Sequence, residues 1–462
     1  MLEKIRLAAA ALALSATVAG AALAAPLTPA DTARIDASVR DWLKRTGAPS
    51  ASIAVVRDGK VAYARAYGLA RTAPATPATP ASRYAIASVS KEFTAVAILI
   101  LQAQGKLSLD DKVSRFLPDL ASADRVTLRQ LLSHTAGYRD FWPQDFVPPE
   151  MTRPVTVQAL LDEWAKKPLD FEPGADWQYS NTGYAVAGAI VEKASGQPLL
   201  AFLQAHVFQP LHMEGVIDHD ALPERPSDAL PYTRYGLGPV RPAAKEGRGW
   251  LFAAGELAMT PTELAKWDIS LMDRSLLTPA SYEAMLTPVK LTSGRDTHYG
   301  LGLDIEDDHG RLRIGHGGEA SGMVTDNRMW PAQRTAVVVT TNSDAASAES
   351  LNARVAAVAV APTAAEARAR RVFDDLRQGR IERDLFTANG NSYLTAQALA
   401  DHKAGLGRLG PAWLFQLASE SQRGGMTTRV WTITTSTRTL RAVERGFDNG
   451  KLEQFLILDV VN

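Results

Sequence analysis

Ser88-Val89-Ser90-Lys91 opens a largely apolar run, 93–101, that ends near Gly105. If this run is a helix, Ser88 and Lys91 are three positions apart and lie on one face, so the hydroxyl and the ammonium point into the same small volume. Free N–H groups at a helix N-terminus favour negative charge near the serine. A serine hydroxyl is a weak nucleophile near neutral pH, and a lysine of lowered pKa can activate it. The spacing therefore predicts a nucleophile with its proton partner; a capping serine beside a solvated lysine is the structural alternative.

A second motif, Tyr179-Ser180-Asn181, follows Pro173-Gly174 and precedes Gly183, which places it on a loop just before a helix. A tyrosine acts as a base only where a cation, such as the Lys91 ammonium, lowers its pKa from about 10. The amide of Asn181 has both a donor and an acceptor, which suits a substrate amide. A turn with an aromatic side chain is the alternative interpretation of this segment.

A third motif, His316-Gly317-Gly318-Glu319, follows a predicted strand. Its glycines allow another group to approach the backbone closely, and the N–H after them can donate into an oxyanion hole. His316 can orient a carboxylate or the tyrosine. A glycine-rich hairpin explains the same residues without any chemistry.

The three motifs occur in an order, and at separations, that fit one domain. Through Ser88-x-x-Lys91, Tyr179-x-Asn181 and His316-x-Gly318 the chain resembles the penicillin-recognising serine hydrolases. This superfamily includes class C β-lactamases, D-alanyl-D-alanine carboxypeptidases and related esterases. Three further stretches carry the resemblance, which covers about residues 30–355: LLSHTAG (131–137), PGADWQYSNTGY (173–184) and AAGELAMTPTELAKW (253–267).

The resemblance implies acyl transfer through a covalent intermediate, with no cofactor. Ser88 is then the nucleophile that forms an ester with the substrate. Lys91 and Tyr179 share the proton transfers, with Tyr179 as the base. The substrate-binding residues implied are Asn181, His316, Gly318 and Glu319, where the N–H groups of Ser88 and Glu319 form the oxyanion hole.

Two residues depart from the family pattern. His316 stands where many relatives carry lysine, and near neutral pH a histidine holds a substrate carboxylate less reliably than a lysine. This argues for a peptidase or an esterase rather than an efficient β-lactamase. Glu256 follows Gly255 where relatives often have a second glycine, and the sequence offers no account of its carboxylate. His134 is expected to be structural rather than catalytic.

The composition is that of an ordinary soluble globular protein of two to three domains: 462 residues, 46% hydrophobic, 22% charged, with a net charge of zero. This balance gives no argument for nucleic acid or an anionic membrane as a partner. The absence of cysteine excludes a thiol nucleophile and any cysteine-based zinc site. The eight histidines show no His-Glu-x-x-His pattern, so no metal is expected.

The first 24 residues are predicted to be a signal peptide. Lys4 and Arg6 precede an apolar stretch, 7–23, and Ala22-Leu23-Ala24 fits a cleavage site. The stretch is short for a membrane anchor, which is the alternative. We therefore expect an exported protein, periplasmic or secreted, with no stable membrane span after cleavage.

The order of predicted elements is strands, then helices, then strands. Strands are predicted at 51–56 and 61–67, joined by Asp58-Gly59, and at 299–305, 311–314, 322–330 and 335–341. Helices are predicted from Ser88 onward and at 127–132, 157–167, 184–194 and 261–272, while 72–80 reads as a loop. Strands from both ends can share one sheet, so we expect an α+β fold: an antiparallel sheet flanked by helices, with a helical subdomain.

A boundary is predicted near residues 360–365. It separates a hydrolase domain, 25–360, and a linker, 361–366, from a small α+β domain, 367–462. The predicted elements of the latter are helices at 365–376 and 392–404 and strands at 412–420, 427–434, 439–445 and 452–460. Their order resembles a nuclear-transport-factor-like cone. The expected role is a stabilising appendage, and nothing in the sequence supports a role in substrate access.

Together these patterns predict an exported serine hydrolase that acts on an amide or ester. The partner is a small-molecule or peptide substrate, such as a D-amino acid peptide, a β-lactam or a small ester. The alternative is a non-catalytic ligand-binding or sensor protein on the same fold. Such degenerate relatives usually lose the serine, the lysine or the tyrosine, and all three are present here. The natural substrate and the oligomeric state stay open.

Overall fold

The computed structural model describes residues 26–142, 148–308, 310–412, 414–435 and 437–459. The predicted signal peptide and its cleavage site lie outside the described residues. Between residues 26 and 459, no helix that the structure describes is both long and apolar enough to cross a bilayer.

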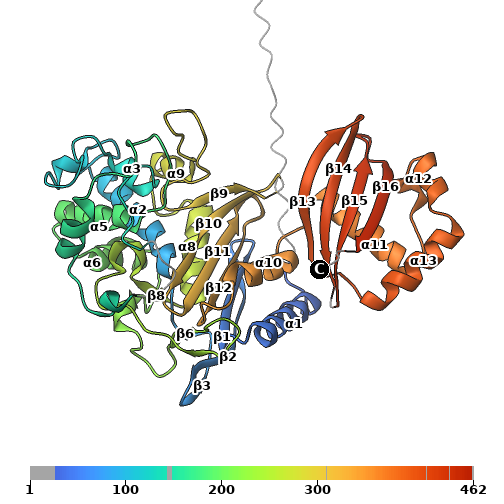
Figure 1. The fold of residues 1–462 in the computed structure, drawn as a ribbon, viewed down its shortest axis with the longest axis horizontal. Coiled ribbons are helices and arrows are strands. Elements are labelled where there is room, and N and C mark those ends of the chain that lie inside the picture. Colours follow the sequence, from blue (N-terminus) through green and yellow to red (C-terminus); the bar gives the residue numbers. More distant parts are fainter. Residues whose placement is uncertain (1–25, 143–147, 309, 413, 436, 460–462) are drawn as a thin grey trace, which may run out of the picture.

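A seven-stranded antiparallel sheet forms the centre of the larger part (Figure 1). Its strand order is β3-β2-β1-β12-β11-β10-β9. The strands are β1 (Ser50–Arg57), β2 (Lys60–Thr72), β3 (Ala75–Pro77), β9 (Asp304–Asp307), β10 (Leu312–Ala320), β11 (Met323–Trp330) and β12 (Thr335–Thr341). Because β1 pairs with β12, the two ends of this part of the chain share one sheet, and the predicted α+β architecture is confirmed.

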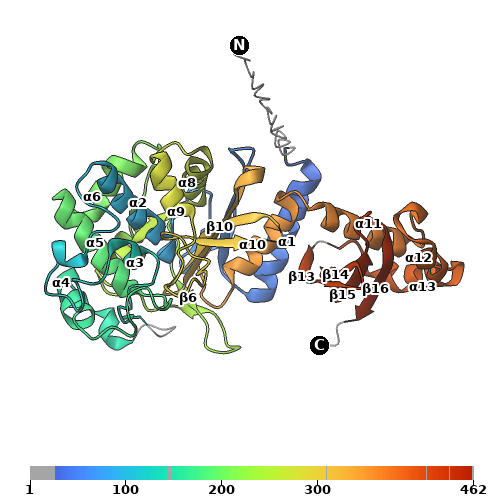
Figure 2. The same ribbon diagram turned by 90° about the horizontal axis from the view of Figure 1, so that it is seen from above.

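Strand β1 is buried on both faces because its apolar residues alternate between two cores. Ile53 and Val55 join a core beneath α1 (Pro29–Thr46) and α10 (Ala348–Ala359). Ala54 and Val56 join the larger core on the opposite face, which α8 (Pro261–Asp273) covers. The sheet is thus a middle layer between helices, as Figure 2 shows from above.

The helical region packs beyond α8 against the same face of the sheet (Figure 1). Its helices are α2 (Ser90–Ala103), α3 (Leu128–Leu132), α4 (Val157–Leu160), α5 (Asn181–Ser195), α6 (Leu199–Leu203), α7 (Phe252–Gly255) and α9 (Pro279–Leu286). Short strands tie it to the sheet: β4 (Tyr84–Ala85), β5 (Ile217–Asp218) and β8 (Leu257–Met259) form one small sheet, and β6 (Tyr232–Thr233) and β7 (Arg241–Pro242) another.

Several predicted boundaries are wrong, each for a local reason. The strand predicted at 299–305 begins only at Asp304, because Gly302 at φ +81° closes a turn against the backbone of Lys91. The loop predicted at 72–80 contains β3, which pairs with the long β2. The helix predicted at 157–167 is α4 followed by a π-helical turn, η4 (Leu161–Ala165). Helix α5 begins at Asn181 rather than 184, because Ser180 caps it.

The C-terminal part is a four-stranded antiparallel sheet with helices on one face (Figure 2). Its strands are β13 (Leu414–Arg423), β14 (Met426–Thr434), β15 (Thr439–Gly446) and β16 (Leu452–Asp459), and its helices are α11 (Ala364–Gln378), α12 (Ala388–Tyr393) and α13 (Ala396–Leu406). Phe373, Trp431 and Phe455 lie in a core of its own. Helix α11 begins inside the predicted linker, 361–366, because Thr363 caps it.

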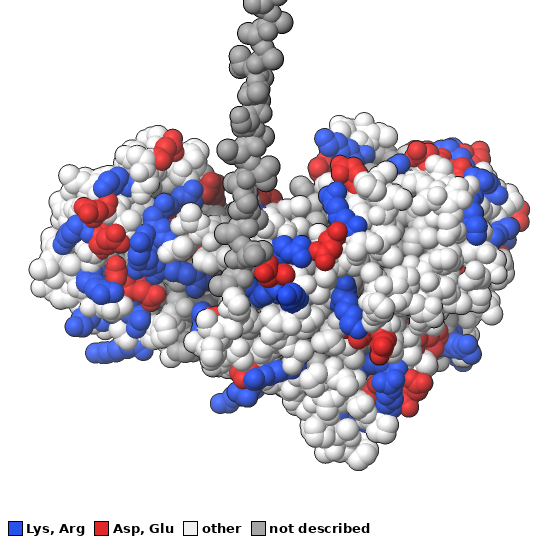
Figure 3. Space-filling model, turned by 180° about the vertical axis from the view of Figure 1, so that it is seen from behind, with Lys and Arg blue, Asp and Glu red and all other residues white. Residues whose placement is uncertain are grey.

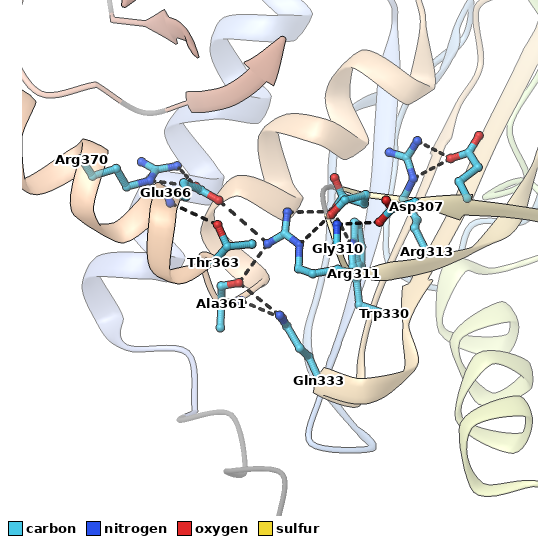
Figure 4. A network of polar contacts seen from close by, with 12 residues as sticks. Asp307, Gly310, Arg311, Arg313, Trp330, Gln333, Ala361, Thr363, Glu366 and Arg370 are labelled. Atoms are coloured by element: carbon cyan, nitrogen blue, oxygen red, sulfur yellow. Dashed lines mark hydrogen bonds and ion pairs between the residues drawn. The ribbon is translucent and has the colours of Figure 1, made fainter. Parts of the chain in front are cut away.

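Arg311, between β9 and β10, ties the connecting segment to the main sheet (Figure 4). Its guanidinium pairs with Asp308 at 2.7 Å and with Glu366 of α11 at 3.9 Å, and donates to the carbonyl of Ala361 at 3.0 Å. Gln333 exchanges two hydrogen bonds with the backbone of Ala361. On the face seen in Figure 3, basic and acidic side chains occur over both parts of the molecule, in keeping with a net charge of zero.

Candidate active site

Ser88 lies in a 3-10 turn, η1 (Ala87–Val89), directly before α2, rather than in the helix itself. The turn forms because Ala87 adopts a left-handed conformation at φ +46°, which is unusual for a residue with a side chain. Gly318 makes room for it, whereas a side chain at Gly255 would make only an ordinary contact with it. A Cβ on Gly318 would lie 2.1 Å from the carbonyl oxygen of Ile86 and 3.1 Å from the amide nitrogen of Ser88, and a Cβ on Gly255 would lie 3.5 Å from Ala87.

Lys91, in the first turn of α2, has no exposed surface. Its Nζ lies 2.9 Å from Ser88 Oγ, 2.8 Å from Asn181 Oδ1 and 2.7 Å from the carbonyl oxygen of Ala254. Burial lowers the pKa of Lys91 to about 7, although the nearby Asp140 carboxylate favours the charged form. A neutral amine in this position can donate to Asn181 and Ala254 while its lone pair accepts the proton of Ser88.

Asn181 begins α5 and is fixed by Asp140, a residue that the sequence motifs did not single out. Asp140 accepts hydrogen bonds from the backbone N–H of Asn181 at 3.0 Å and from its Nδ2 at 3.2 Å. Since Oδ1 of Asn181 faces Lys91 and an amide nitrogen has two hydrogens, one N–H is left for a substrate.

Tyr179 lies between the lysine and the cavity. Lys91 Nζ is 4.8 Å from the centre of its ring, and the phenol forms a side-chain hydrogen bond with Ser88. Burial nevertheless raises the pKa of Tyr179 above its usual value. The role of base that the resemblance implies for Tyr179 therefore does not fit its protonation state, because a buried phenol of raised pKa stays protonated near neutral pH.

His316 occupies the middle of β10, not the end of a strand, because β11 pairs with the whole glycine-rich segment. Its Nδ1 contacts the carbonyl oxygen of Gly317, and its Nε2 lies 2.8 Å from the hydroxyl of Tyr299. A carbonyl only accepts, so Nδ1 carries the proton and Nε2 accepts from the tyrosine. Burial lowers the pKa of His316 to about 4, so this side chain is neutral near pH 7.

The predicted residues surround one cavity of about 1030 Å³ between the helical region and the edge of β10. Its lining includes Ser88, Tyr179, Asn181, His316, Gly318 and Glu319. Lys91 lies beneath its floor, through the contacts given above. The N–H groups of Ser88 and Glu319, proposed from the resemblance as the oxyanion hole, belong to segments that Gly318 brings into contact.

His134 and Glu256 lie outside the cavity lining. His134 accepts a hydrogen bond from the backbone N–H of Ser180 at 3.1 Å and lies 4.2 Å from the ring of Tyr179, measured between ring centres. It therefore positions the second motif. Burial and three neighbouring carboxylates, Asp218, Glu192 and Asp220, raise the pKa of Glu256 to about 8.

Tyr299 and the charged residues Asp304, Asp326 and Arg328 also line the cavity and were not predicted. An aspartate and an arginine within the predicted strand 322–330 were the available signal. Among the described residues, no group of three or more His, Asp or Glu is arranged to hold a metal ion.

Comparisons with known proteins show what the chain is similar to. The family model described as "Beta-lactamase" matches residues 35–361. Esterase EstB of Burkholderia gladioli is 37% identical over 225 residues, 45% of this chain and 56% of the esterase. Penicillin-binding protein 4* of Bacillus subtilis is 28% identical over 62% of this chain and 64% of its own length. A D-aminopeptidase of Brucella anthropi is 28% identical over 66% of this chain and 56% of its own length.

The chain thus spans 56–64% of the length of these curated relatives. Among solved structures, a penicillin-binding protein from Bacillus halodurans is similar with a TM-score of 0.61 and 26% identity, over 69% of this chain and 98% of that one. The octameric penicillin-binding protein homologue from Pyrococcus abyssi has a TM-score of 0.64 at 20% identity and covers 93% of this chain and 98% of its own, so the fold match includes the C-terminal part.

Proposed function

The chain belongs to the beta-lactamase family of serine hydrolases, and from this we propose that it hydrolyses an amide or ester through an acyl-enzyme formed on Ser88. The observation that carries the proposal is the buried Lys91 amine, 2.9 Å from Ser88 Oγ, with a pKa lowered to about 7. A serine with such a neighbour has a base at hand near neutral pH, which a merely structural serine does not need.

In the proposed acylation, the neutral amine of Lys91 accepts the proton of Ser88 as Oγ bonds to the substrate carbonyl carbon. The N–H groups of Ser88 and Glu319 stabilise the charge on the carbonyl oxygen. The hydroxyl of Tyr179 then gives its proton to the leaving group and receives the proton held by Lys91. The phenol is neutral before and after this relay, in keeping with its raised pKa.

Deacylation reverses these transfers with water as the nucleophile. Lys91, neutral again, accepts a proton from a water molecule that attacks the ester carbonyl. The ester bond to Oγ breaks, Ser88 regains a proton, and the carboxylic acid product leaves. Asn181 holds the substrate through its remaining N–H.

We place the activity among the peptidases and esterases of the family rather than the efficient β-lactamases. Neutral His316 offers a substrate carboxylate no cation where many relatives carry lysine. The D-aminopeptidase and the esterase among the relatives support this choice. Export to the periplasm or medium, and a stabilising role for a nuclear-transport-factor-like C-terminal domain, remain parts of the proposal.

Labelling tests the nucleophile. A fluorophosphonate or penicillin probe should modify Ser88, identified by peptide mapping, and p-nitrophenyl acetate should turn over. Lys91→Ala should abolish turnover, whereas Lys106→Ala, near the other end of α2 and exposed, should not change it. An unlabelled Ser88 peptide under conditions that label a related enzyme, with no ester turnover, would favour the non-catalytic binding protein instead.

A further inference from the structure

Acidic residues outnumber basic residues in the lining of the cavity. Among the described lining residues, six are acidic and one, Arg328, is basic, besides the neutral His316; the acidic ones are Asp140, Asp304, Glu319, Asp326, Asp344 and Glu349. Two of these have evident structural roles. Asp140 holds Asn181, and Asp344 accepts a hydrogen bond from the backbone N–H of Gly322. Asp304 on β9 pairs with Gly315, and Asp326 on β11 pairs with Gly317, so both lie on the side of the sheet that α10 covers, opposite the side chain of His316.

On that side, Asp304 and Asp326 share a single cation. Arg328 Nη1 lies 2.9 Å from Asp304 Oδ2, and Arg328 Nε lies 3.1 Å from Asp326 Oδ1. We call these three residues the acidic cluster. Two carboxylates around one guanidinium leave a net charge of −1, and Glu349 at the start of α10 adds another negative charge to the same side. Arg328 is therefore fully compensated and offers little attraction to an anionic substrate group.

One oxygen of the acidic cluster has no partner. The side chain of Asp326 is 4% exposed, and its Oδ2 has no hydrogen-bond donor among the described residues. A buried carboxylate oxygen without a donor is costly, and such groups are normally satisfied. Burial raises the pKa of Asp326 to about 6 although Arg328 opposes this, so the carboxylate is mostly charged above neutral pH.

Gly317, in the third motif, places no side chain over this buried carboxylate. Gly317 lies opposite Asp326 in the β10–β11 register, so both residues face the same side of the sheet. A Cβ on Gly317 would lie 3.9 Å from both Asp326 Oδ1 and Arg328 Nη2, close enough for a larger side chain to cover them. With glycine here, no β10 side chain at this position covers the acidic cluster, whose three residues line the cavity, while His316, the preceding residue of β10, faces the other side of the sheet.

We propose that the acidic cluster is a subsite for an ammonium group of the substrate, with Asp326 and Asp304 as its ligands and Arg328 as a positioning residue. An ammonium has three N–H donors and no acceptor, so it can satisfy the free oxygen of Asp326 and neutralise the excess charge. A substrate carboxylate would instead meet two carboxylates and a compensated arginine. This inference rests on the proposed hydrolase function and narrows it to amides or esters that carry a free amine.

Three matched probes test the subsite: D-phenylalaninamide, its N-acetyl derivative and its N-succinyl derivative, which are cationic, neutral and anionic. Each is measured as a competitive inhibitor of p-nitrophenyl acetate hydrolysis. The wild-type protein should bind the free amine roughly tenfold more tightly than the N-acetyl probe, and the N-succinyl probe least tightly. Asp326→Asn and Asp304→Asn should each reduce the first ratio about tenfold, because each removes one charge but keeps an oxygen acceptor.

Asp307→Asn is the matched control. It makes the same change on the same strand as Asp304, at an exposed position outside the cavity lining, and should leave the ratio unchanged. Equal or tighter binding of the N-acetyl or N-succinyl probe by the wild-type protein would overturn the subsite, as would unchanged ratios in the two variants. Asp326→Asn could fail to fold, because the side chain it replaces is buried. In that case the subsite is tested by the wild-type ratios and by Asp304→Asn, which replaces a side chain that is 32% exposed.

The inference and the proposed function fail in different ways. Absent turnover of p-nitrophenyl acetate contradicts the hydrolase, and titration calorimetry with the same three probes then measures the subsite alone. Normal turnover without preference for the amine contradicts only the subsite.

Discussion

The proton of Lys91 decides when Ser88 can react. The ammonium form cannot accept the serine proton, whereas the neutral amine can, and burial lowers the pKa of Lys91 to about 7. Neither nearby histidine changes its protonation state near pH 7, so neither can account for a change in activity there. Burial lowers the pKa of His316 to about 4 and that of His134 well below its ordinary value, so both are already neutral, and hydrogen bonds to Tyr299 and Ser180 occupy one nitrogen of each.

This assignment predicts the pH dependence of hydrolysis. As pH rises toward 7, the amine of Lys91 loses its proton, so kcat/KM for p-nitrophenyl acetate should rise about tenfold per pH unit and level off above about 7. The profile is measured after subtraction of spontaneous hydrolysis. Lys91→Arg, which stays charged, should be inactive throughout. A profile that is flat from pH 5 to 8, or whose midpoint lies near 4, would exclude the lysine as the titrating base.

At the scale of elements, the contact between η1 and β10 sets the position of Ser88 relative to the proposed oxyanion hole. Gly318 allows this contact, since a Cβ there would lie 2.1 Å from the carbonyl oxygen of Ile86. A backbone atom cannot move aside as a flexible side chain can. The strand or the turn must therefore shift if residue 318 gains a side chain.

We predict that Gly318→Ala lowers kcat for p-nitrophenyl acetate by about 100-fold, because a displacement near 1 Å between catalytic groups costs about that much. Gly317→Ala is the control for folding. Its Cβ meets only side-chain atoms at 3.9 Å, so the thermal midpoint should stay close to that of the wild-type protein. Circular dichroism checks that both variants are folded. Activity of Gly318→Ala near the wild-type value would show that the close packing does not position the serine.

Sequence patterns predict those elements whose signals are local. The hairpin at Asp58-Gly59 is confirmed because both residues adopt the left-handed conformation that such a turn requires, and α3 begins at a Thr127 capping box. Strand β10 was predicted to end at Ile314, because glycines next to one another usually mark turns. Pairing with β11 carries it to Ala320, and that pairing is a property of the sheet rather than of the segment.

The residues of the candidate site also fall into two groups, those that local sequence patterns predict and those that only the fold brings together. Ser88 and Lys91 are neighbours in sequence, so their proximity could be predicted from helical spacing alone. Asp140 is 41 residues from Asn181, and Arg328 is 24 residues from Asp304, so only the folded chain brings these pairs together. The strand prediction for 299–305 also missed the turn that points Tyr299 at His316.

In the molecule as a whole, hydrophobic burial is divided between the two parts. The two large cores involve residues between 27 and 360, and the core of the C-terminal part involves residues between 365 and 457. The links between the parts are fewer and more polar. They include the Arg311–Glu366 ion pair at 3.9 Å and contacts between α10 and β13.

A chain that ends after Pro362 should therefore fold and hydrolyse p-nitrophenyl acetate within a few-fold of the full-length rate, because parts with separate cores generally fold alone. The truncation keeps α10 and the Gln333–Ala361 hydrogen bonds and removes the ion pair, which is worth about 1 kcal/mol or less if it behaves as an ordinary surface pair. Thermal unfolding should show a small decrease in midpoint, and full-length protein serves as the reference. A truncated protein with native circular dichroism but without turnover would mean that the C-terminal part supports the site directly. A truncated protein that does not fold would show that the hydrolase part needs the C-terminal part as a structural partner.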